Sequence, residues 1–150
     1  MTVFENLAYP LREHTNLKEA QIKSKVLDLL EELGLSGNDQ VLPAELFGGM
    51  QKRAGLARSI ILEPDVILYD EPTAGLDPYN TLKIQEIITN LKNRGVTSIL
   101  VSHDMPSAKA VCDRIALLQN GTIGAMGTIE DMEKNPNNPI KQFVEGIIYG

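Results

Sequence analysis

Two short segments that are typical of buried strands, each followed by residues that can carry chemistry, constrain the fold of this chain more than any other feature. The first, Val66 to Tyr69, precedes the acidic pair Asp70 and Glu71, and the second, Val96 to Ser102, precedes His103. A short apolar run such as Val66 to Tyr69 is typical of a strand buried in a parallel sheet, and we interpret Val96 to Ser102 as a second buried strand. Since a helical pattern separates the two runs, the sequence predicts a strand–helix–strand unit and an α/β fold.

Helical patterns dominate the chain before the first strand. Thr2 followed by Glu5 indicates a capped helix start, and Gly34 is a typical helix stop. Three helices are predicted there: a short one that Pro10 disturbs or ends, one from Lys18 to Gly34, and one from Gly49 to about Leu62. We therefore predict a helical subdomain over residues 1–63 and an α/β region over residues 64–150.

Turn and cap signals divide the rest of the α/β region. They predict a helix from Asp77 to Arg94, a helix from Pro106 to Cys112, a strand from Arg114 to Gln119, a hairpin turn at Asn120–Gly121, a cap at Thr128 and a last helix from Pro139 to Ile148. Two buried strands and one hairpin make a small sheet, so we expect further strands to come from elsewhere. Without them the sheet edge would be exposed, and we expect aggregation, domain swapping or self-association.

The charge balance and the cysteine content exclude several classes of protein. The 14 basic and 20 acidic residues give a net charge of -6, which argues against a broad nucleic-acid-binding surface. No apolar run approaches the ~20 residues that a membrane helix needs, so we expect membrane contact only through a partner. The single cysteine, Cys112, cannot form an intramolecular disulfide, which favours a reducing interior.

Two adjacent glycines, Gly48 and Gly49, precede the third predicted helix, which carries several basic residues. A helix N-terminus exposes unpaired N–H groups and a partial positive charge, and glycines let an anion approach them closely. The pair therefore suits phosphate binding, although glycines before a helix more often serve only as caps. The preceding residue, Phe47, has no hydroxyl to donate to a phosphate.

The acidic pair after the first strand is a candidate catalytic centre. Carboxylates at the carboxyl edge of a parallel sheet lie where open α/β folds bind ligands. Asp70 could hold Mg²⁺, directly or through water, and Glu71 could polarise an attacking water. The alternative is that one acid caps the following turn while the other is solvated.

Asp77 and His103 are weaker candidates when each is considered alone. As a cap for the helix that Pro78 begins, Asp77 needs no further role. A neutral imidazole at His103, just past the second strand, could hydrogen-bond a phosphate or the attacking water. A single histidine at a strand end commonly has no such role.

Taken in order and spacing, these four features resemble the C-terminal part of an ABC-type ATPase, the nucleotide-binding subunit of ABC transporters. LFGGMQKR stands where the family has its signature motif, ILYDEP matches the Walker B strand with its catalytic glutamate, AGLDP the D-loop, and VSHD the switch histidine. The resemblance covers essentially all 150 residues. It implies the C-terminal portion of a P-loop NTPase fold: a helical signature subdomain and an incomplete, mainly parallel sheet with flanking helices.

The resemblance also implies how the site residues are used. ABC ATPases pair head to tail, and ATP with Mg²⁺ lies between the phosphate loop of one subunit and the signature helix of the other. Asp70 would then bind Mg²⁺, while Glu71 and His103 would be catalytic. The residues expected to face the ATP of a second ATPase subunit are Phe47, Gly48, Gly49, Met50 and Asp77.

A finer resemblance concerns the transported substrate. The segments MTVFENLAYPLREHT, PAEL, GGM in place of GGQ, and NPNNPIKQFVEG resemble ATPases of the Mla type. Those serve bacterial phospholipid and organic-solvent-tolerance transport together with a permease and a lipid-binding partner. The resemblance implies a cytoplasmic lipid-transport ATPase on the inner face of the bacterial cell membrane, bound to a transmembrane permease.

Two departures from the family pattern affect the expected activity. The 150 residues contain no GxxxxGK(S/T), the loop that wraps the β- and γ-phosphates. We therefore expect an N-terminally truncated member that binds ATP very weakly and hydrolyses none by itself. Phe47 also replaces a serine hydroxyl, and losing a hydrogen bond to a charged group costs ~1.5–3 kcal/mol. The alternative is that Phe47 packs into the helical subdomain and the site tolerates it.

The sequence leaves two other functions open. The chain could be a non-catalytic interaction module that docks on a permease or on a full-length ATPase. An upstream phosphate-loop motif would favour the transporter ATPase, and a genuine start at Met1 would favour the interaction module. The chain could also be a soluble ABC-type ATPase of DNA repair or translation, but the acidic charge and the absence of a coiled-coil insertion disfavour that class.

Overall fold

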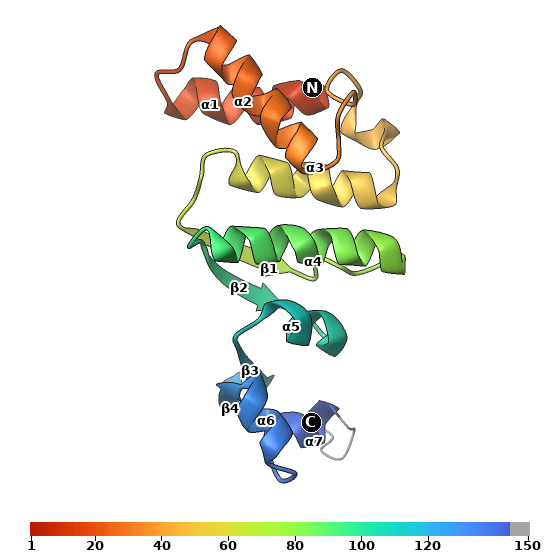
Figure 1. The fold of residues 1–150 in the computed structure, drawn as a ribbon, viewed down its shortest axis with the longest axis vertical. Coiled ribbons are helices and arrows are strands. Elements are labelled where there is room, and N and C mark those ends of the chain that lie inside the picture. The colour runs from red at the N-terminus through yellow and green to blue at the C-terminus, as the bar shows by residue number, and fades with distance from the viewer. Residues whose placement is uncertain (145–150) are drawn as a thin grey trace.

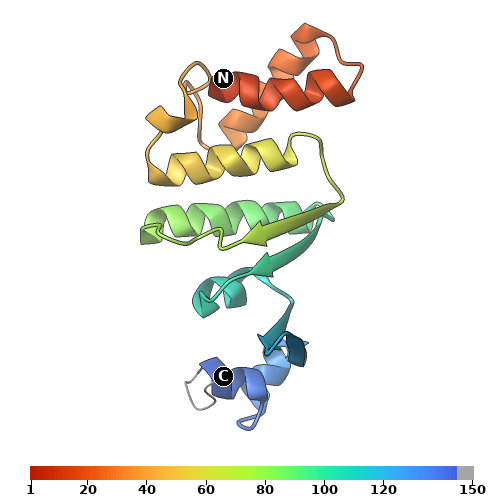
Figure 2. The same ribbon diagram turned by 180° about the vertical axis from the view of Figure 1, so that it is seen from behind.

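The structure is a computed structural model that describes residues 1–144, with its elements arranged in successive layers along one long axis (Figure 1). The helices are α1 Val3–His14, α2 Glu19–Glu32, η1 Pro43–Glu45 (a 3₁₀ helix), α3 Gly48–Ile60, α4 Pro78–Asn93, α5 Met105–Val111, α6 Ile129–Lys134 and α7 Pro139–Val144. The strands are β1 Val66–Asp70, β2 Thr97–Val101, β3 Arg114–Gln119 and β4 Thr122–Thr128. α1 and α7 lie at opposite ends of the molecule in both views (Figures 1 and 2).

The first helix, α1, contradicts the alternative that Pro10 ends it. α1 begins after Thr2, whose hydroxyl accepts a hydrogen bond from the Glu5 N–H (3.2 Å), and continues through Pro10. A proline inside a helix costs about 3 kcal/mol, because it removes one hydrogen bond and crowds the preceding turn. Burying Leu7 and Leu11 stabilises the helix by roughly 1.5–3 kcal/mol each, which offsets that cost.

The N-terminal helices and the α/β region share one hydrophobic core. α2 ends before Gly34, the predicted stop, which has a φ of +66°. Side chains from α1, α2, α3, β1 and α4 form a single buried cluster, to which β1 contributes Ile67 and Tyr69. Because this cluster crosses residue 63, the helices pack directly on the α/β region, and the predicted division at that residue stays a prediction.

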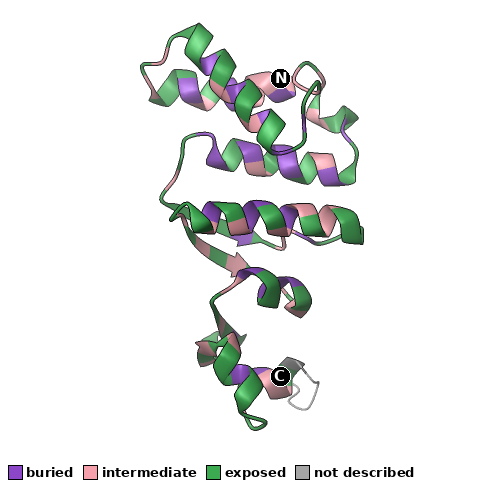
Figure 3. Cartoon of the chain, viewed as in Figure 1, coloured by how far each residue is buried: buried purple, intermediate pink, exposed green. Residues whose placement is uncertain are grey.

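β1 and β2 form a two-stranded parallel sheet, as predicted, and Asp70 pairs with Val101 at its end. The expectation that both strands are buried is wrong for one face. Ile67 and Tyr69 of β1 are buried in the core that includes α4. No described element covers the opposite face, which carries Val66, Leu68, Ile99 and Val101; these residues are 52 to 74% exposed. In Figure 3, β2 is coloured as exposed or intermediate along its length.

The C-terminal layer is an antiparallel hairpin, β3–β4, with two short helices against it. Asn120 and Gly121 form its turn, with φ values of +48° and +77°. Positive φ at both central positions is what a type I′ turn requires, so the predicted hairpin is confirmed. A small separate cluster holds this layer together and consists of Leu117, Met132 and Ile140.

Helix starts predicted in the α/β region are confirmed. The Asp77 carboxylate accepts a hydrogen bond from the Asn80 N–H (3.0 Å) at the start of α4. The Thr128 hydroxyl accepts one from the Asp131 N–H (3.0 Å) at the start of α6. α7 is also present, whereas its predicted continuation to Ile148 lies outside the described residues. Within residues 1–144, no helix is long and apolar enough to cross a membrane.

We predict that the exposed sheet face makes the 150-residue polypeptide self-associate, because apolar patches and open strand edges favour association in water. Replacing Leu68 and Ile99 together by threonine keeps strand propensity but removes apolar area from that face. Sedimentation velocity should then give a smaller average mass at equal concentration. Leu82→Thr, at an exposed position of α4, is the matched control and should leave the mass unchanged. A monodisperse monomer of the parent chain would contradict the prediction.

Candidate functional site

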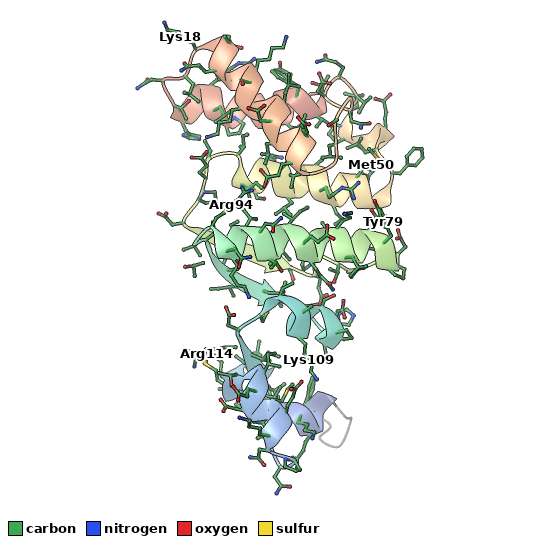
Figure 4. All side chains as sticks on the ribbon, in the orientation of Figure 1. Lys18, Met50, Tyr79, Arg94, Lys109 and Arg114 are labelled. Atoms are coloured by element: carbon green, nitrogen blue, oxygen red, sulfur yellow. The ribbon has the colours of Figure 1, made fainter. Side chains whose placement is uncertain are left out.

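The N-termini of α3 and α4 and the carboxyl ends of β1 and β2 lie on the same side of the molecule (Figures 1 and 2). In Figure 4, Met50 in the first turn of α3 and Tyr79 in the first turn of α4 mark this side. Helix N-termini and the carboxyl ends of parallel strands are the places where α/β proteins commonly bind ligands. The glycine pair, the acidic pair and His103, which the sequence predicted separately, are therefore gathered on one side.

Glu71 follows β1 in an unusual backbone conformation. Its φ is +46°, in the left-handed region that residues other than glycine rarely adopt. The Glu71 N–H still donates to the Val101 carbonyl (2.9 Å), so the chain turns sharply directly after the strand pair ends. Its neighbour Asp70 occupies the last position of β1 and is exposed.

The segment after β2 engages both oxygens of the Glu71 carboxylate. Oε1 accepts a hydrogen bond from the His103 N–H (2.9 Å) and lies 2.7 Å from the His103 Nδ1. Oε2 accepts from the Ser102 hydroxyl (3.1 Å). The pKa of Glu71 lies below its ordinary value, chiefly because of the hydrogen bond with the His103 side chain. Sequence reasoning placed Glu71 and His103 in the site but missed Ser102 and the direct contact.

A second polar network joins the same two segments, and the sequence did not predict it. Asp104 caps α5, binds the Ser107 hydroxyl and accepts from the Thr73 hydroxyl (3.1 Å). Gln85 of α4 donates to the Ser107 hydroxyl oxygen (2.8 Å). Because Thr73 and Ser107 are buried, this network fixes the loop after β1 against the loop after β2. The residue that could have indicated this network is Asp104, which directly follows His103 in the VSHD segment.

The two glycines occupy different environments at the start of α3. Gly48 is exposed, and a Cβ there would meet nothing within 4 Å, whereas Gly49 is buried against Asn80. Phe47 is the N-cap residue, makes no capping hydrogen bond with its side chain and is 82% exposed. The alternative that Phe47 packs into the helical subdomain is therefore wrong. Met50 is partly buried against the main core.

Comparison with known proteins identifies the family. The family model described as ABC transporter matches residues 1–74. The whole chain is 43% identical to the intermembrane phospholipid transport system ATP-binding protein MlaF of Escherichia coli strain K12 and covers 56% of that protein. This chain belongs to the ABC transporter ATP-binding family. The resemblance inferred from the four motifs is thereby confirmed.

Other members of the ABC family are also similar over nearly all of this chain. It is 37% identical, over 97% of its length, to the probable ribonucleotide transport ATP-binding protein mkl of Mycobacterium leprae, of which it covers 42%. It is 38% identical, over 98% of its length, to the methionine import ATP-binding protein MetN of Carboxydothermus hydrogenoformans, of which it covers 44%. The chain thus spans about half the length of the curated relatives it matches.

ABC ATPases in general bind ATP with Mg²⁺, and the residues of this site fit both groups. Among the described residues, no cluster of three or more His, Cys, Asp or Glu side chains could hold a metal ion alone. Mg²⁺ in nucleotide sites is typically held by one or two carboxylates together with phosphate oxygens and water. The exposed Asp70 carboxylate at the end of β1 fits that donor set, and the open helix start at Gly48 fits a phosphate.

The network around Asp104 should make stability depend on pH. The Ser107 hydroxyl is the largest cause that holds the pKa of Asp104 below its ordinary value. A lowered pKa means that folding favours the carboxylate. This contribution is therefore present above the unfolded pKa of about 3.9 and is lost as the pH falls through the folded value.

Asp104→Asn keeps a capping side chain but removes the charge, so we expect a lower melting temperature than the parent at neutral pH. The difference should shrink at a pH below the folded pKa, where the parent carboxyl is protonated. Thermal melts of both chains at the two pH values check this, with the exposed Asp65→Asn as control. A difference of equal size at both pH values would count against the charged network.

Proposed function

We propose that this chain supplies the signature helix, the catalytic carboxylate and the switch histidine to the ATP-hydrolysing site of an ABC transporter. The observation that carries the proposal is the parallel pairing of β1 with β2, which sets Glu71 against His103 and beside Asp70. Hydrolysis needs one group that directs a water at the γ-phosphate and another that binds Mg²⁺. Glu71 and Asp70 carry carboxylates suited to these two tasks.

Asp70 is assigned to Mg²⁺, which when bound neutralises charge on the phosphates. Glu71 orients the attacking water, and its lowered pKa makes it a weak base before the transition state. An ionised carboxylate only accepts hydrogen bonds, so the His103 Nδ1 carries the proton of their contact. The His103 side chain is 84% exposed, and its Nε2 donates to a phosphate only when the ring is protonated.

The signature helix and the D-loop are assigned to ATP held by a second ATPase subunit. Gly48 leaves the start of α3 open, so its N–H groups and helix dipole meet the γ-phosphate across the interface. Asp77 is exposed on the same side, at the start of α4. In this head-to-tail arrangement each site is composite, and the 150 residues supply one half of it.

The cargo we propose is phospholipid, moved through a transmembrane permease to which this ATPase binds. The support is the 43% identity, over the whole chain, with a protein named for intermembrane phospholipid transport. Relatives named for ribonucleotide and methionine transport are 37 and 38% identical. The corresponding location is cytoplasmic, on the inner face of the bacterial cell membrane, where the permease provides the membrane contact.

A non-catalytic role is the second candidate, and Phe47 favours it. An aromatic side chain that is 82% exposed stands where a hydroxyl donor would meet the phosphate. The chain would then dock on a permease or on a complete ATPase and contribute a weak signature face. Since the 150 residues contain no GxxxxGK(S/T), we also propose that this polypeptide alone binds ATP weakly and hydrolyses none. Calorimetry that gave it micromolar affinity for ATP with Mg²⁺ would contradict this.

Removing the proposed catalytic charge should stop turnover while ATP binding persists. For Glu71→Gln in the assembled transporter ATPase, we expect kcat to fall about 10²- to 10³-fold, because the amide no longer directs the water. The matched control is Glu86→Gln, an exposed glutamate of α4 paired with Lys83, which should keep full activity. A rate for Glu71→Gln within about threefold of the parent would exclude the assigned role.

Phe47→Ser should stabilise α3 and restore a hydroxyl donor to the site. Serine at a helix N-cap typically contributes about 1 kcal/mol, and Phe47 makes no capping hydrogen bond with its side chain. Phe47→Ala removes the ring without adding a hydroxyl and is the control. We expect Phe47→Ser to melt higher than Phe47→Ala and to hydrolyse ATP faster than the parent in the assembled ATPase. Equal rates for parent and Phe47→Ser would show that Phe47 does not impair the site.

A further inference from the structure

Three side chains join the signature helix to the D-loop. Arg53, in the second turn of α3, donates from Nη1 to the Asn80 Oδ1 (3.1 Å). The Asn80 side-chain amide donates to the Asp77 carboxylate, and the Asn80 backbone N–H donates to the same carboxylate (3.0 Å). These three residues form the Arg53–Asn80–Asp77 bridge, which runs between the starts of α3 and α4.

Opposite charges stand at the two ends of the bridge. The Asn80 oxygen faces the Arg53 guanidinium and its NH₂ group faces the Asp77 carboxylate, so each end of the amide dipole meets the opposite charge. Arg53 is only 9% exposed, and its Nε has no hydrogen-bond partner within residues 1–144. Removing the partner of a buried charge strongly destabilises the folded protein. The burial of the Arg53 guanidinium therefore depends on its hydrogen bond with Asn80. The hydrogen bond with the Asn80 side chain in turn lowers the pKa of Asp77.

Gly49 permits the close approach that the bridge requires. A Cβ on Gly49 would lie 2.0 Å from the Asn80 Oδ1 and 2.8 Å from the Asn80 Cβ, which is closer than such atoms can come. A Cβ on Gly48 would meet nothing within 4 Å. The second glycine is therefore required by packing inside this chain, whereas the first leaves the helix start open.

We propose that Asn80 is a positioning residue, which together with Arg53 fixes the signature helix and the D-loop as one rigid face toward the nucleotide. The proposal rests on the proposed function, since it concerns how the same composite site is held. The loop that carries Asp77 includes Gly75 in the left-handed region (φ +73°), and the bridge ties the end of this loop to α3. A misplacement of about 1 Å in such a site can cost about 10²-fold in rate. Arg53 and Asn80 therefore control turnover through the position of Asp77, without touching ATP themselves.

The first test compares the two glycines in the intact ATPase. Gly49→Ala forces Asn80 aside, and we expect its melting temperature to fall by about 5 °C or more. Gly48→Ala adds a methyl group in open space and should melt within about 1 °C of the parent or above it. Equal melting temperatures for the two variants would overturn the packing role of Gly49 and with it the geometry of the bridge.

The second test measures ATPase kinetics, well below the melting temperatures, for Arg53→Met, Asn80→Ala and the double variant. If the three residues act as one unit, each single variant should lose about tenfold in kcat with KM for ATP nearly unchanged, and the double variant should lose no more than either single one. Arg53→Lys keeps a cation that can donate to Asn80 and should recover kcat to within about threefold of the parent. A loss of structure alone would not produce this rescue or an unchanged KM.

Two results would overturn the proposal: unchanged kcat in both single variants, or losses in the double variant that multiply. If the assembled parent hydrolyses no ATP, the proposed function fails, but the bridge is still tested by the melting temperatures of the parent, Arg53→Met, Asn80→Ala and the double variant. A coupled bridge then gives a double-variant shift smaller than the sum of the single shifts. Additive shifts would reject the bridge.

Discussion

The parallel pairing of β1 with β2 is the interaction on which the candidate site depends. Its register ends with Asp70 opposite Val101, so the residues that follow the two strands, Glu71 on one side and Ser102 with His103 on the other, meet directly. A slip of one residue would turn every side chain of a strand to the other face and separate these groups. The polar network at the start of α5 holds the two loops in the same relation, because the buried Thr73 hydroxyl of one loop donates to the Asp104 carboxylate of the other.

The contact between α3 and α4 has a comparable role for the second half of the site. It rests on a glycine where any side chain would collide, and on a buried guanidinium that an asparagine links to the D-loop carboxylate. The start of α3 and one face of the sheet meanwhile expose large apolar side chains, among them Phe47 and Leu68. Such surfaces are unfavourable in water. In the proposed assembly a second ATPase subunit completes the site, and the exposed start of α3 would pack against the nucleotide-binding face of that subunit.

Local chemistry made much of this fold predictable from the sequence. The glycine stop at Gly34, the Asp77 cap and the Asn120–Gly121 turn are decided by a few neighbouring residues, and the structure has all three. The helix does not end at Pro10, because the burial of Leu7 and Leu11 in the core offsets the local cost of the proline. The exposed sheet face and the hydrogen bonds of Glu71 with Ser102 and His103 could not be predicted in this way. They depend on which segments pack together, and the spacing of apolar residues along the sequence does not determine that. Conversely, the motif order pointed to the ABC family correctly, because each motif is a local pattern.

The central claim is that these residues form half of a composite nucleotide site, and a structure of the assembled ATPase with ATP and Mg²⁺ tests it most directly. The Glu71→Gln variant would hold the nucleotide unhydrolysed for that purpose. The account predicts a γ-phosphate within hydrogen-bond distance of the Gly48 N–H of one subunit and Mg²⁺ near Asp70 of the other. Nucleotide bound wholly within one subunit, with Gly48 and Asp77 facing solvent in the closed assembly, would contradict it.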